Sequence, residues 1–391
     1  MKKTLLTICL VWMCFSLSAQ KIIDLSGKWS FSIDRQDNGE KEKWFSHTLN
    51  DFINLPGSMP EKLKGDEVTA KTQWTGSLYD SSYYYNPYME KYRKEGNIKF
   101  PFFLTPDKHY VGAAWYQKEV NIPADWKGER ILLFLERPHI ETTVWVNGQK
   151  TGMQNSLCVP HQYDITHYVR PGKCTITIRV DNRIKEINVG PDSHSITDQT
   201  QGNWNGIVGR ICLQTTPKTY FDDIQIYPEP EQKLARVKVV IKGTGTAKVK
   251  LSAESFNTDK KHIVPAIQQE IKLNKGVTET EMVLPMGNDM LLWDEFHPAL
   301  YKLKAEVTNG KKTEIKEIQF GMRRFEIKGK WFYVNGRKTQ LRGTVENCDF
   351  PLTGYAPMDV ESWERVFRIC RNYGLNHMRF HSFCPPEAAF M

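Results

Sequence analysis

Short runs of alternating apolar and polar residues dominate the first half of the chain. The clearest are GKWSFSID (27–34), AAWYQKEVNIP (113–123), ILLFLER (131–137), ETTVWVNGQK (141–150) and CTITIRVDN (174–182). A period of two sends successive side chains to opposite faces, so each run predicts a β-strand. Asn147-Gly148 predicts a type I′ hairpin turn. Because convincing helical periodicity is absent here, residues 20–219 are expected to form a jelly-roll β-sandwich.

A polar segment, residues 72–107, interrupts this pattern. It contains YDSSYYYNPYMEKYRKEGN, which is rich in Tyr, Ser, Asn and charged residues. We expect a long inserted loop, and a loop of this length is either functional or disordered. Packing on its own sandwich is the simpler role, and a wall beside a sugar pocket is the alternative.

A second β region covers residues 220–325. Its runs are ARVKVVIKG, AKVKLSAESF, QQEIKL, TEMVLP, LYKLKAEVTNG and TEIKEIQFG. Roughly seven strands in about a hundred residues is the rhythm of an immunoglobulin-like β-sandwich. We expect Glu229-Pro230-Glu231 to be a linker.

The pattern changes again over residues 326–391. FEIKGKWFYVNGRKTQLRGT predicts a hairpin that turns at Asn335-Gly336 and then a strand near 340–344. DVESWERVFRICRNYG predicts a helix that Asp359 caps and Gly374 ends. Its apolar positions share one helical face: Val360, Trp363, Val366, Phe367 and Cys370. Residues 375–381 predict another strand, so this segment is a βαβ unit with two parallel strands.

Composition adds two constraints. Aromatic residues make up 12% of the 391 positions, with 11 Trp and 16 Tyr, which suits a β-protein or a sugar binder. Core packing is the simpler role for any single Trp. The net charge is +8, but Lys and Arg are spread along the chain. We therefore expect no nucleic-acid partner.

The first residues, MKKTLLTICLVWMCFSLSAQ, have the pattern of an export signal. Lys2 and Lys3 precede an apolar stretch that is too short to span a bilayer, and a small-residue cleavage site ends at Ala19. We expect residues 1–19 to be removed and the protein to be periplasmic or secreted. No later stretch predicts a membrane span.

Two of the eight cysteines, Cys9 and Cys14, lie in the expected signal. The other six contain no C-x-x-C pair, which argues against a zinc site, and no metal-ligand cluster or cofactor motif is evident. Export permits disulfides, but a chain of this length does not need them. Most of these cysteines are expected to be buried thiols: Cys158, Cys174, Cys212, Cys348, Cys370 and Cys384.

Several segments, in order, carry a family resemblance. They are WYQKEVNIP (115–123), VWVNGQKTG (144–152), YDIT (163–166), GIVGRICL (206–213), LLWDEFHPALYKLKAEV (291–307), FGMRRFEI (320–327) and FYVNGRKTQLRGT (332–344). Together they resemble glycoside hydrolase family 2, which includes β-galactosidases, β-glucuronidases and β-mannosidases. The resemblance implies a jelly-roll sugar-binding domain, an immunoglobulin-like sandwich and then a (β/α)8 barrel that starts near residue 326.

The resemblance also implies a retaining mechanism with two Glu on the fourth and seventh barrel strands. This chain reaches the second strand, so we expect both Glu to lie beyond Met391, with no catalytic residue inside the chain. The expected activity is hydrolysis of terminal β-linked sugars of an oligosaccharide or glycan. A β-galactosidase is favoured, with β-glucuronidase and β-mannosidase as alternatives, and we expect the chain alone to be inactive.

Candidate substrate-binding residues lie near the ends of the predicted barrel strands. His377, Arg379 and His381 alternate on one face of a strand that should be buried on both faces. The family carries an Arg at the position of Arg379 and a His shortly after it, although the spacing to His381 is one residue shorter than usual. Pairing with a barrel carboxylate is the alternative role for Arg379.

Three further candidates come from neighbouring loops. Glu346 and Asn347 follow the first barrel strand, where Val345-Glu346-Asn347-Cys348 replaces the N-x-H pattern of the family. Asp198 precedes the G-I-x-R strand and is offset by about two residues from an Asp that relatives bring to the sugar. An exposed loop carboxylate is the alternative role for Asp198.

Two other functions fit tandem sandwiches. One is a non-catalytic carbohydrate-binding protein, and the other is an extracellular adhesion or interaction module. The carbohydrate-binding hypothesis predicts a stable end after about Phe325. The βαβ unit argues against it, because a lone unit leaves unpaired strand edges and an uncovered apolar face. The sequence sets no oligomeric state.

Overall fold

The computed structural model describes residues 20–75, 85–99, 101–185, 193–198, 200 and 202–391. The expected export signal lies outside the described residues, as do positions 76–84 and 100 of the predicted insert. The described chain forms two compact units. One comprises residues 217–326 and 333–337, and the other comprises residues 21–216, 327–332 and 338–391.

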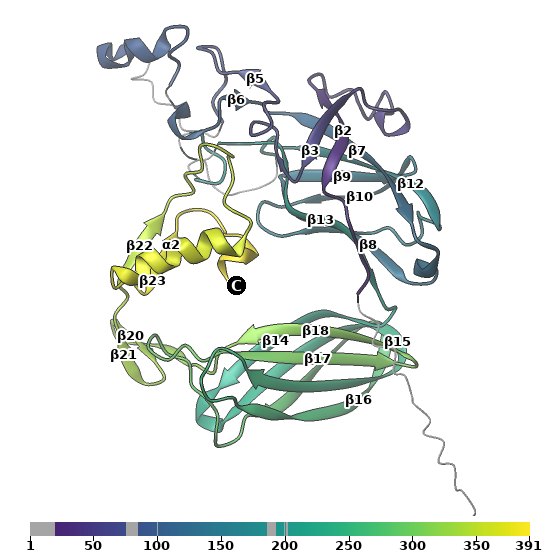
Figure 1. Ribbon diagram of the computed structural model, residues 1–391, viewed down its shortest axis with the longest axis vertical. Helices are drawn as coiled ribbons and strands as arrows, with labels where there is room; N and C mark the ends of the chain where they lie inside the picture. The colour runs from purple at the N-terminus through teal and green to yellow at the C-terminus, as the bar shows by residue number, and fades with distance from the viewer. Residues whose placement is uncertain (1–19, 76–84, 100, 186–192, 199, 201) are drawn as a thin grey trace, which may run out of the picture. The chain divides into compact units, whose positions relative to one another are not determined.

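Two antiparallel sheets form the first sandwich (Figure 1). The first has the order β1 (Ile22–Asp24), β13 (Gly206–Thr216), β8 (Arg130–His139) and β11 (His161–Asp164), with β4 (Gly57–Ser58) also on β13. The second has the order β10 (Gln149–Asn155), β9 (Glu141–Val146), β12 (Gly172–Asp181), β7 (Ala113–Ile122), β2 (Gly27–Asp34) and β3 (Asp51–Leu55). The strand order departs from the sequence order, as expected for a jelly roll.

One core joins the two sheets. Trp29, Tyr116 and Ile178 come from the second sheet, and Leu133 and Ile211 come from the first. All five are at most 1% exposed, because alternate residues of each strand face inward. The predicted hairpin turn is confirmed, since Asn147 and Gly148 have φ values of 51° and 77° between β9 and β10. The predicted sandwich over the first half of the chain is therefore confirmed.

Short elements complete this region. They are the 3-10 helices η1 (Trp44–Ser46), η2 (Pro87–Arg93), η3 (Phe102–Leu104) and η4 (Ala124–Trp126), and the paired strands β5 (Asp66–Glu67) and β6 (Lys108–His109). The described part of the predicted insert thus contains two 3-10 helices. Asn86 caps η2 by accepting the N–H of Tyr88.

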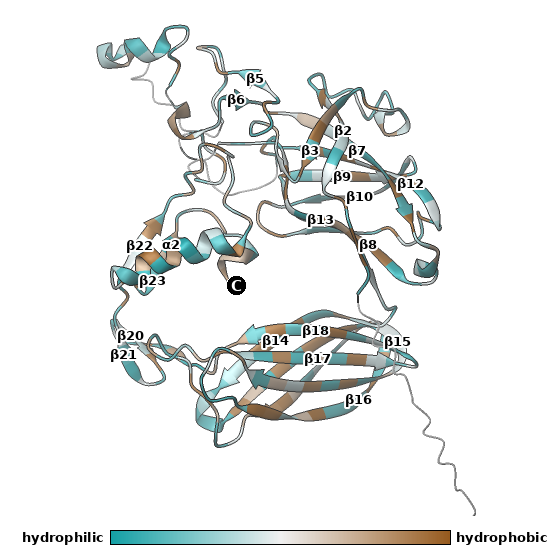
Figure 2. Ribbon diagram, viewed as in Figure 1, coloured by the Kyte–Doolittle hydropathy of each residue, from teal (hydrophilic) through white to brown (hydrophobic). Residues whose placement is uncertain are grey.

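The second sandwich contains fewer and longer strands than predicted. Its strands are β14 (Tyr220–Glu229), β15 (Leu234–Ser255), β16 (Ile263–Pro285), β17 (Tyr301–Asn309) and β18 (Lys312–Phe320). The prediction of about seven short strands is wrong, because β15 and β16 each join two predicted runs. Apolar and polar residues alternate along the strands of this sheet (Figure 2).

A bend in β15 explains the difference. Pairing with β16 shifts register between Gly243 and Gly245, and both glycines have positive φ. Both halves of β15 contribute to one core, Val239 before the bend and Val249 after it. The paired strands β15 and β16 therefore bend around one core, and no loop interrupts either strand at the bend. The expected linker at 229–231 is also wrong, since these residues lie at the turn between β14 and β15.

The predicted βαβ unit is confirmed. A small sheet of β19 (Phe325–Lys328), β20 (Trp331–Val334) and β21 (Arg337–Thr339) precedes it. Strand β22 (Gly343–Glu346) pairs in parallel with β23 (His377–Phe380), and helix α2 (Val360–Asn372) connects them. Asp359 caps α2 by accepting the N–H of Ser362, and Gly374 follows its end with a φ of 76°. The 3-10 helix η6 (Glu387–Ala389) follows β23.

Helix α2 covers one face of the strand pair. The Trp363 ring lies 5.8 Å from the ring of Phe380 and stacks on Phe367. Because strand residues alternate, His377 and Arg379 lie on the opposite face. Both are exposed, so the expectation of a strand buried on both faces is wrong for the described residues. The described sheet has two strands, and one helix covers only one of its faces.

Across the described residues, no helix has the length and apolar character that crossing a membrane requires.

We predict that Leu133→Ala destabilises the first sandwich by roughly 2–5 kcal/mol, since Leu133 is fully buried and truncation leaves a cavity. Leu352→Ala is the matched control, because Leu352 is 86% exposed and its truncation should change stability by less than about 0.5 kcal/mol. Chemical denaturation followed by tryptophan fluorescence measures both. Equal losses in the two variants would contradict the assigned core.

Candidate functional site

The carboxyl ends of β22 and β23 lie side by side. Their parallel register pairs Val345 with Arg379 and Glu346 with Phe380. The backbone N–H of His381 continues the pairing by donating to the carbonyl of Glu346 at 2.9 Å. The residues that leave these two strands are therefore brought together, and this edge is where (β/α)8 enzymes carry their chemistry.

A loop of the jelly-roll sandwich packs against this edge. The hydroxyls of Ser193 and Ser195 both donate to the carbonyl of Ser382, at 2.9 and 2.8 Å. Nδ1 of His194 lies 2.8 Å from the carbonyl of Asn347, and because a carbonyl only accepts, this nitrogen carries the proton. These contacts connect the loop to both strand ends.

His194 and His381 form the centre of the candidate site. Their ring centroids are 4.1 Å apart. Burial lowers the pKa of His381, and His194 and Arg379 lower it further because they disfavour a second positive charge nearby. A neutral His381 can both donate and accept a hydrogen bond, as sugar hydroxyls require. Arg379 is exposed on the open face of the strand pair and supplies a permanent cation.

Glu346 has a different environment. It shares the helix-covered face with Phe380, so it points away from the face that carries Arg379. Its carboxylate accepts the backbone N–H of Cys348 at 2.7 Å. Burial nevertheless raises the pKa of Glu346, and the nearby charge of Asp349 adds to the effect. The structure therefore places Glu346 near the site but on the other face from Arg379.

Asp198 is deeply buried. Its side chain accepts the backbone N–H of Thr75, and its other oxygen lies 3.4 Å from Nε2 of His109. Asp198 is 2% exposed, so the alternative of an exposed loop carboxylate is wrong. Its contacts connect the 193–198 loop to Thr75 in the predicted insert and to His109 in β6. Asn347, in contrast, has an exposed side chain and contributes its carbonyl to His194. Direct contact of either residue with a sugar stays a prediction.

The sequence reasoning missed His194, Ser193 and Ser195. The signal that could have indicated them is the run Ser193-His194-Ser195, three hydrogen-bonding residues in the loop that also holds Asp198. The sequence does not indicate that they contact Ser382 and Asn347, because these contacts join segments far apart in the chain.

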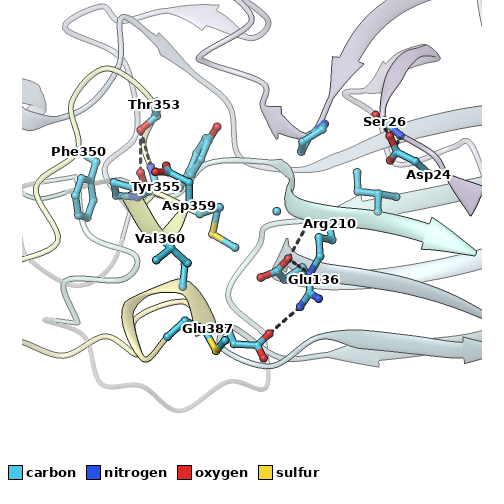
Figure 3. Close-up of a pocket in the computed structure, with 17 residues that line it drawn as sticks. Asp24, Ser26, Glu136, Arg210, Phe350, Thr353, Tyr355, Asp359, Val360 and Glu387 are labelled. Atoms are coloured by element: carbon cyan, nitrogen blue, oxygen red, sulfur yellow. Dashed lines mark hydrogen bonds and ion pairs between the residues drawn. The ribbon is translucent and has the colours of Figure 1, made fainter. Parts of the chain in front are cut away.

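A second feature near the βαβ unit is a hollow of about 790 Å³ beside the N-terminus of α2 (Figure 3). Arg210 lies between the carboxylates of Glu136 and Glu387, at 2.8 and 2.7 Å. Tyr355 donates its hydroxyl to Glu61 at 2.9 Å, outside this ion-pair network. The charged groups Glu136, Arg210 and Glu387 are thus paired with one another and hold the βαβ segment on the sandwich.

A group of aromatic side chains lines a small cavity together with Ser195. His139 at the end of β8 stacks on Trp204 with centroids 4.5 Å apart, and Trp204 also contacts Tyr355 at 5.6 Å. Nε2 of His139 lies 3.0 Å from Oδ1 of Asn203. Burial lowers the pKa of His139 to about 3, so this histidine is neutral at ordinary pH. The described residues contain no group of three or more candidate metal ligands.

Two domains of this chain match models of known protein families. Residues 22–217 match the family 2 glycosyl hydrolase sugar-binding domain, and residues 219–323 match a second domain of the same family. The chain belongs to glycosyl hydrolase family 2. The predicted resemblance is therefore confirmed, and the matched ranges cover the two sandwiches described above.

Curated relatives of this family 2 chain are glycosidases. A β-galactosidase of Thermoanaerobacter pseudethanolicus is 24% identical over 75% of this chain and 39% of its own length. The human β-glucuronidase is 23% identical over 91% of this chain and 53% of its own length. The chain thus spans about half, or less, of the relatives it matches.

Solved structures show the same fold. The apo β-glucuronidase of Ruminococcus gnavus has a TM-score of 0.67 at 19% identity, covering 95% of this chain and 57% of that protein. At this identity the likeness concerns the fold alone. The mainly β class with sandwich-type sheets is therefore confirmed, whereas a (β/α)8 barrel beyond the one βαβ unit stays a prediction.

We predict that acid destabilises the protein through His139. An unfolded chain restores its pKa to about 6.5. Below pH 6.5 the unfolded state binds a proton that the folded state excludes, so the free energy of unfolding falls as pH drops toward 3. From pH 7 to pH 5 this group should cost about 2 kcal/mol.

Urea denaturation at pH 7 and pH 5 measures this effect. His139→Gln should show a smaller loss of stability between the two pH values than the parent. The exposed His47 provides the control, since His47→Gln should lose as much as the parent. If His139→Gln loses as much stability between pH 7 and pH 5 as the parent, His139 is not the group that causes the acid destabilisation.

Proposed function

We propose that this chain forms the substrate-binding portion of a β-glycosidase that removes terminal β-linked sugars from oligosaccharides or glycans. The observation that carries the proposal is the site at the carboxyl ends of β22 and β23, in a chain of glycosyl hydrolase family 2. Arg379, His381 and His194 offer hydrogen bonds and positive charge there. Such polar groups fix the orientation of a sugar ring.

The bond-breaking groups of the proposed enzyme come from further barrel strands. A retaining mechanism needs an acid and a nucleophile whose carboxyl groups are about 5–5.5 Å apart across the glycosidic bond. Glu346 points to the helix-covered face, which argues against it as the nucleophile. We propose that two Glu outside residues 1–391 supply these roles, and that the 391-residue chain binds sugar without hydrolysing it.

We propose a β-galactoside as the first substrate to test, supported by the β-galactosidase relatives. A β-glucuronide is the second candidate, and Arg379 favours it. Its guanidinium is exposed and makes no ion pair with a described residue, so it is free to bind the carboxylate of a uronic acid. Binding of the uronic acid carboxylate by Arg379 would then favour a β-glucuronide over a β-galactoside, which has no carboxylate.

The proposal also includes the domain limits of the chain and its export. We propose domain limits at 20–219, 220–325 and 326–391, and export directed by residues 1–19. A purely carbohydrate-binding or adhesion role is less favoured, because the relatives are enzymes and a βαβ unit follows the sandwiches.

The decisive experiment expresses the gene that encodes this chain through its own stop codon. The product is assayed on 4-nitrophenyl β-galactoside, β-glucuronide and β-mannoside, and NMR follows the anomer first released. We expect turnover of one substrate with release of the β-anomer. The 391-residue chain alone should show none. The absence of turnover on all three substrates, together with glycan binding, would favour the binding module instead.

We predict that Arg379→Ala lowers kcat/KM of the active product roughly 10- to 100-fold, since a hydrogen bond to a charged group is lost. The control is Arg365→Ala, which removes an exposed arginine of α2 and should change kcat/KM less than twofold. If Arg379→Ala keeps the parental kcat/KM on its preferred substrate, Arg379 does not contact the sugar.

A further inference from the structure

Three cysteines from distant parts of the chain line one small cavity. Cys158 follows β10 in the jelly-roll sandwich, Cys348 follows β22, and Cys384 follows β23. The cavity has a volume of about 30 Å³ and also contacts Arg137 and Trp204. Nothing in the proposed glycosidase mechanism uses these thiols, so their convergence needs a separate explanation.

Arg137 fixes the backbone of two of these cysteines. Its Nη1 donates to the carbonyl of Cys384 at 2.6 Å, and its Nη2 donates to the carbonyls of Cys158 at 3.3 Å and Pro385 at 3.0 Å. One planar guanidinium thus connects both cysteine-bearing segments. Because Arg137 holds the backbone at both cysteines, the side chains of Cys158 and Cys384 are restricted to a narrow range of positions.

The side chains of Cys158 and Cys384 line the same cavity, and Sγ of Cys384 lies 3.7 Å from the carbonyl of Pro385. Burial raises the pKa of the Cys158 thiol, and the Cys384 thiol contributes to the rise through a direct side-chain interaction. Cys158 is half-buried and Cys384 is exposed, whereas Cys348 is 1% exposed. An oxidant in solution therefore reaches Cys384 first, and Cys158 is the thiol next to it.

We propose that Cys158 and Cys384 form an oxidisable pair whose disulfide covalently joins the jelly-roll sandwich to the segment that follows β23. This disulfide would lie close to the candidate site. Cys384 lies two residues after Ser382, whose carbonyl holds the loop of Ser193 and Ser195. The disulfide would fix that segment, and with it His381, against the sandwich.

The chemistry is thiol–disulfide exchange with a small-molecule disulfide such as oxidised glutathione. The Cys384 thiolate attacks one glutathione sulfur, forms a mixed disulfide and releases one glutathione thiolate. The Cys158 thiolate then attacks the Cys384 sulfur and releases the second. Two protein thiols are oxidised, one glutathione disulfide is reduced, and two protons pass to the released thiolates. A strainless bond requires the two Cα atoms to be within about 7 Å.

The test incubates the purified chain with oxidised glutathione, removes the reagent and alkylates the remaining thiols. We expect the loss of two titratable thiols and a proteolytic peptide that links Cys158 to Cys384 in the mass spectrum. The melting temperature should rise by several degrees, because the cross-link closes a very long loop. Dithiothreitol should reverse all three changes.

Matched variants separate this pair from the other thiols. Cys158→Ser and Cys384→Ser should each abolish the cross-linked peptide and the thermal shift, whereas Cys370→Ser, on α2, should keep both. The melting temperature of each reduced variant checks that it folds. The proposal is overturned if the parent keeps all its thiols or if Cys348 forms the cross-link. Both results are independent of glycosidase activity, so failure of the proposed function leaves this test intact.

Discussion

Docking of the βαβ unit on the jelly-roll sandwich is the interaction on which the candidate site depends. Two parallel strands and one helix bury a small core of Ala356, Trp363 and Ala388 with a few aromatic neighbours. Such a unit has too little apolar surface to be stable alone. The sandwich offers it polar anchors: Arg210 binds Glu387, Ser58 donates to the carbonyl of Thr353, and Arg137 holds the chain after β23.

The same docking assembles the groups that can meet a sugar. Ser193 and Ser195 reach Ser382, and His194 reaches both Asn347 and His381. The site therefore has one wall from the sandwich loop and one from the strand ends. The bonds from Ser193, Ser195 and His194 end on backbone carbonyls, so they depend on chain position more than on the identity of the side chains of the βαβ segment. We propose that Arg379 and His381 are the side chains that bind the substrate.

Two buried polar side chains, His139 and Asp198, lie near the candidate site. His139 is held neutral in a stack with Trp204, and Asp198 is buried against Thr75 and His109. Asp198 connects the 193–198 loop to Thr75, and His139 lines the same small cavity as Ser195. Protonation of His139 would place an unpaired charge in the interior, which is costly. The cysteines nearby add a second, redox-dependent constraint.

The sequence by itself determined the strands, the turns and the capped helix, because these depend on local alternation, Asn-Gly pairs and the Asp359 and Gly374 ends. It also determined the family, through segments matched in order. It failed on β15 and β16, where glycines let one strand bend across a core, and on the burial of the face that carries Arg379. Only the tertiary structure decided that His194, Asn347 and His381 meet, that Asp198 is buried, and that Cys158 lies beside Cys384. These contacts join segments far apart in the chain, and no local pattern encodes the docking that brings them together.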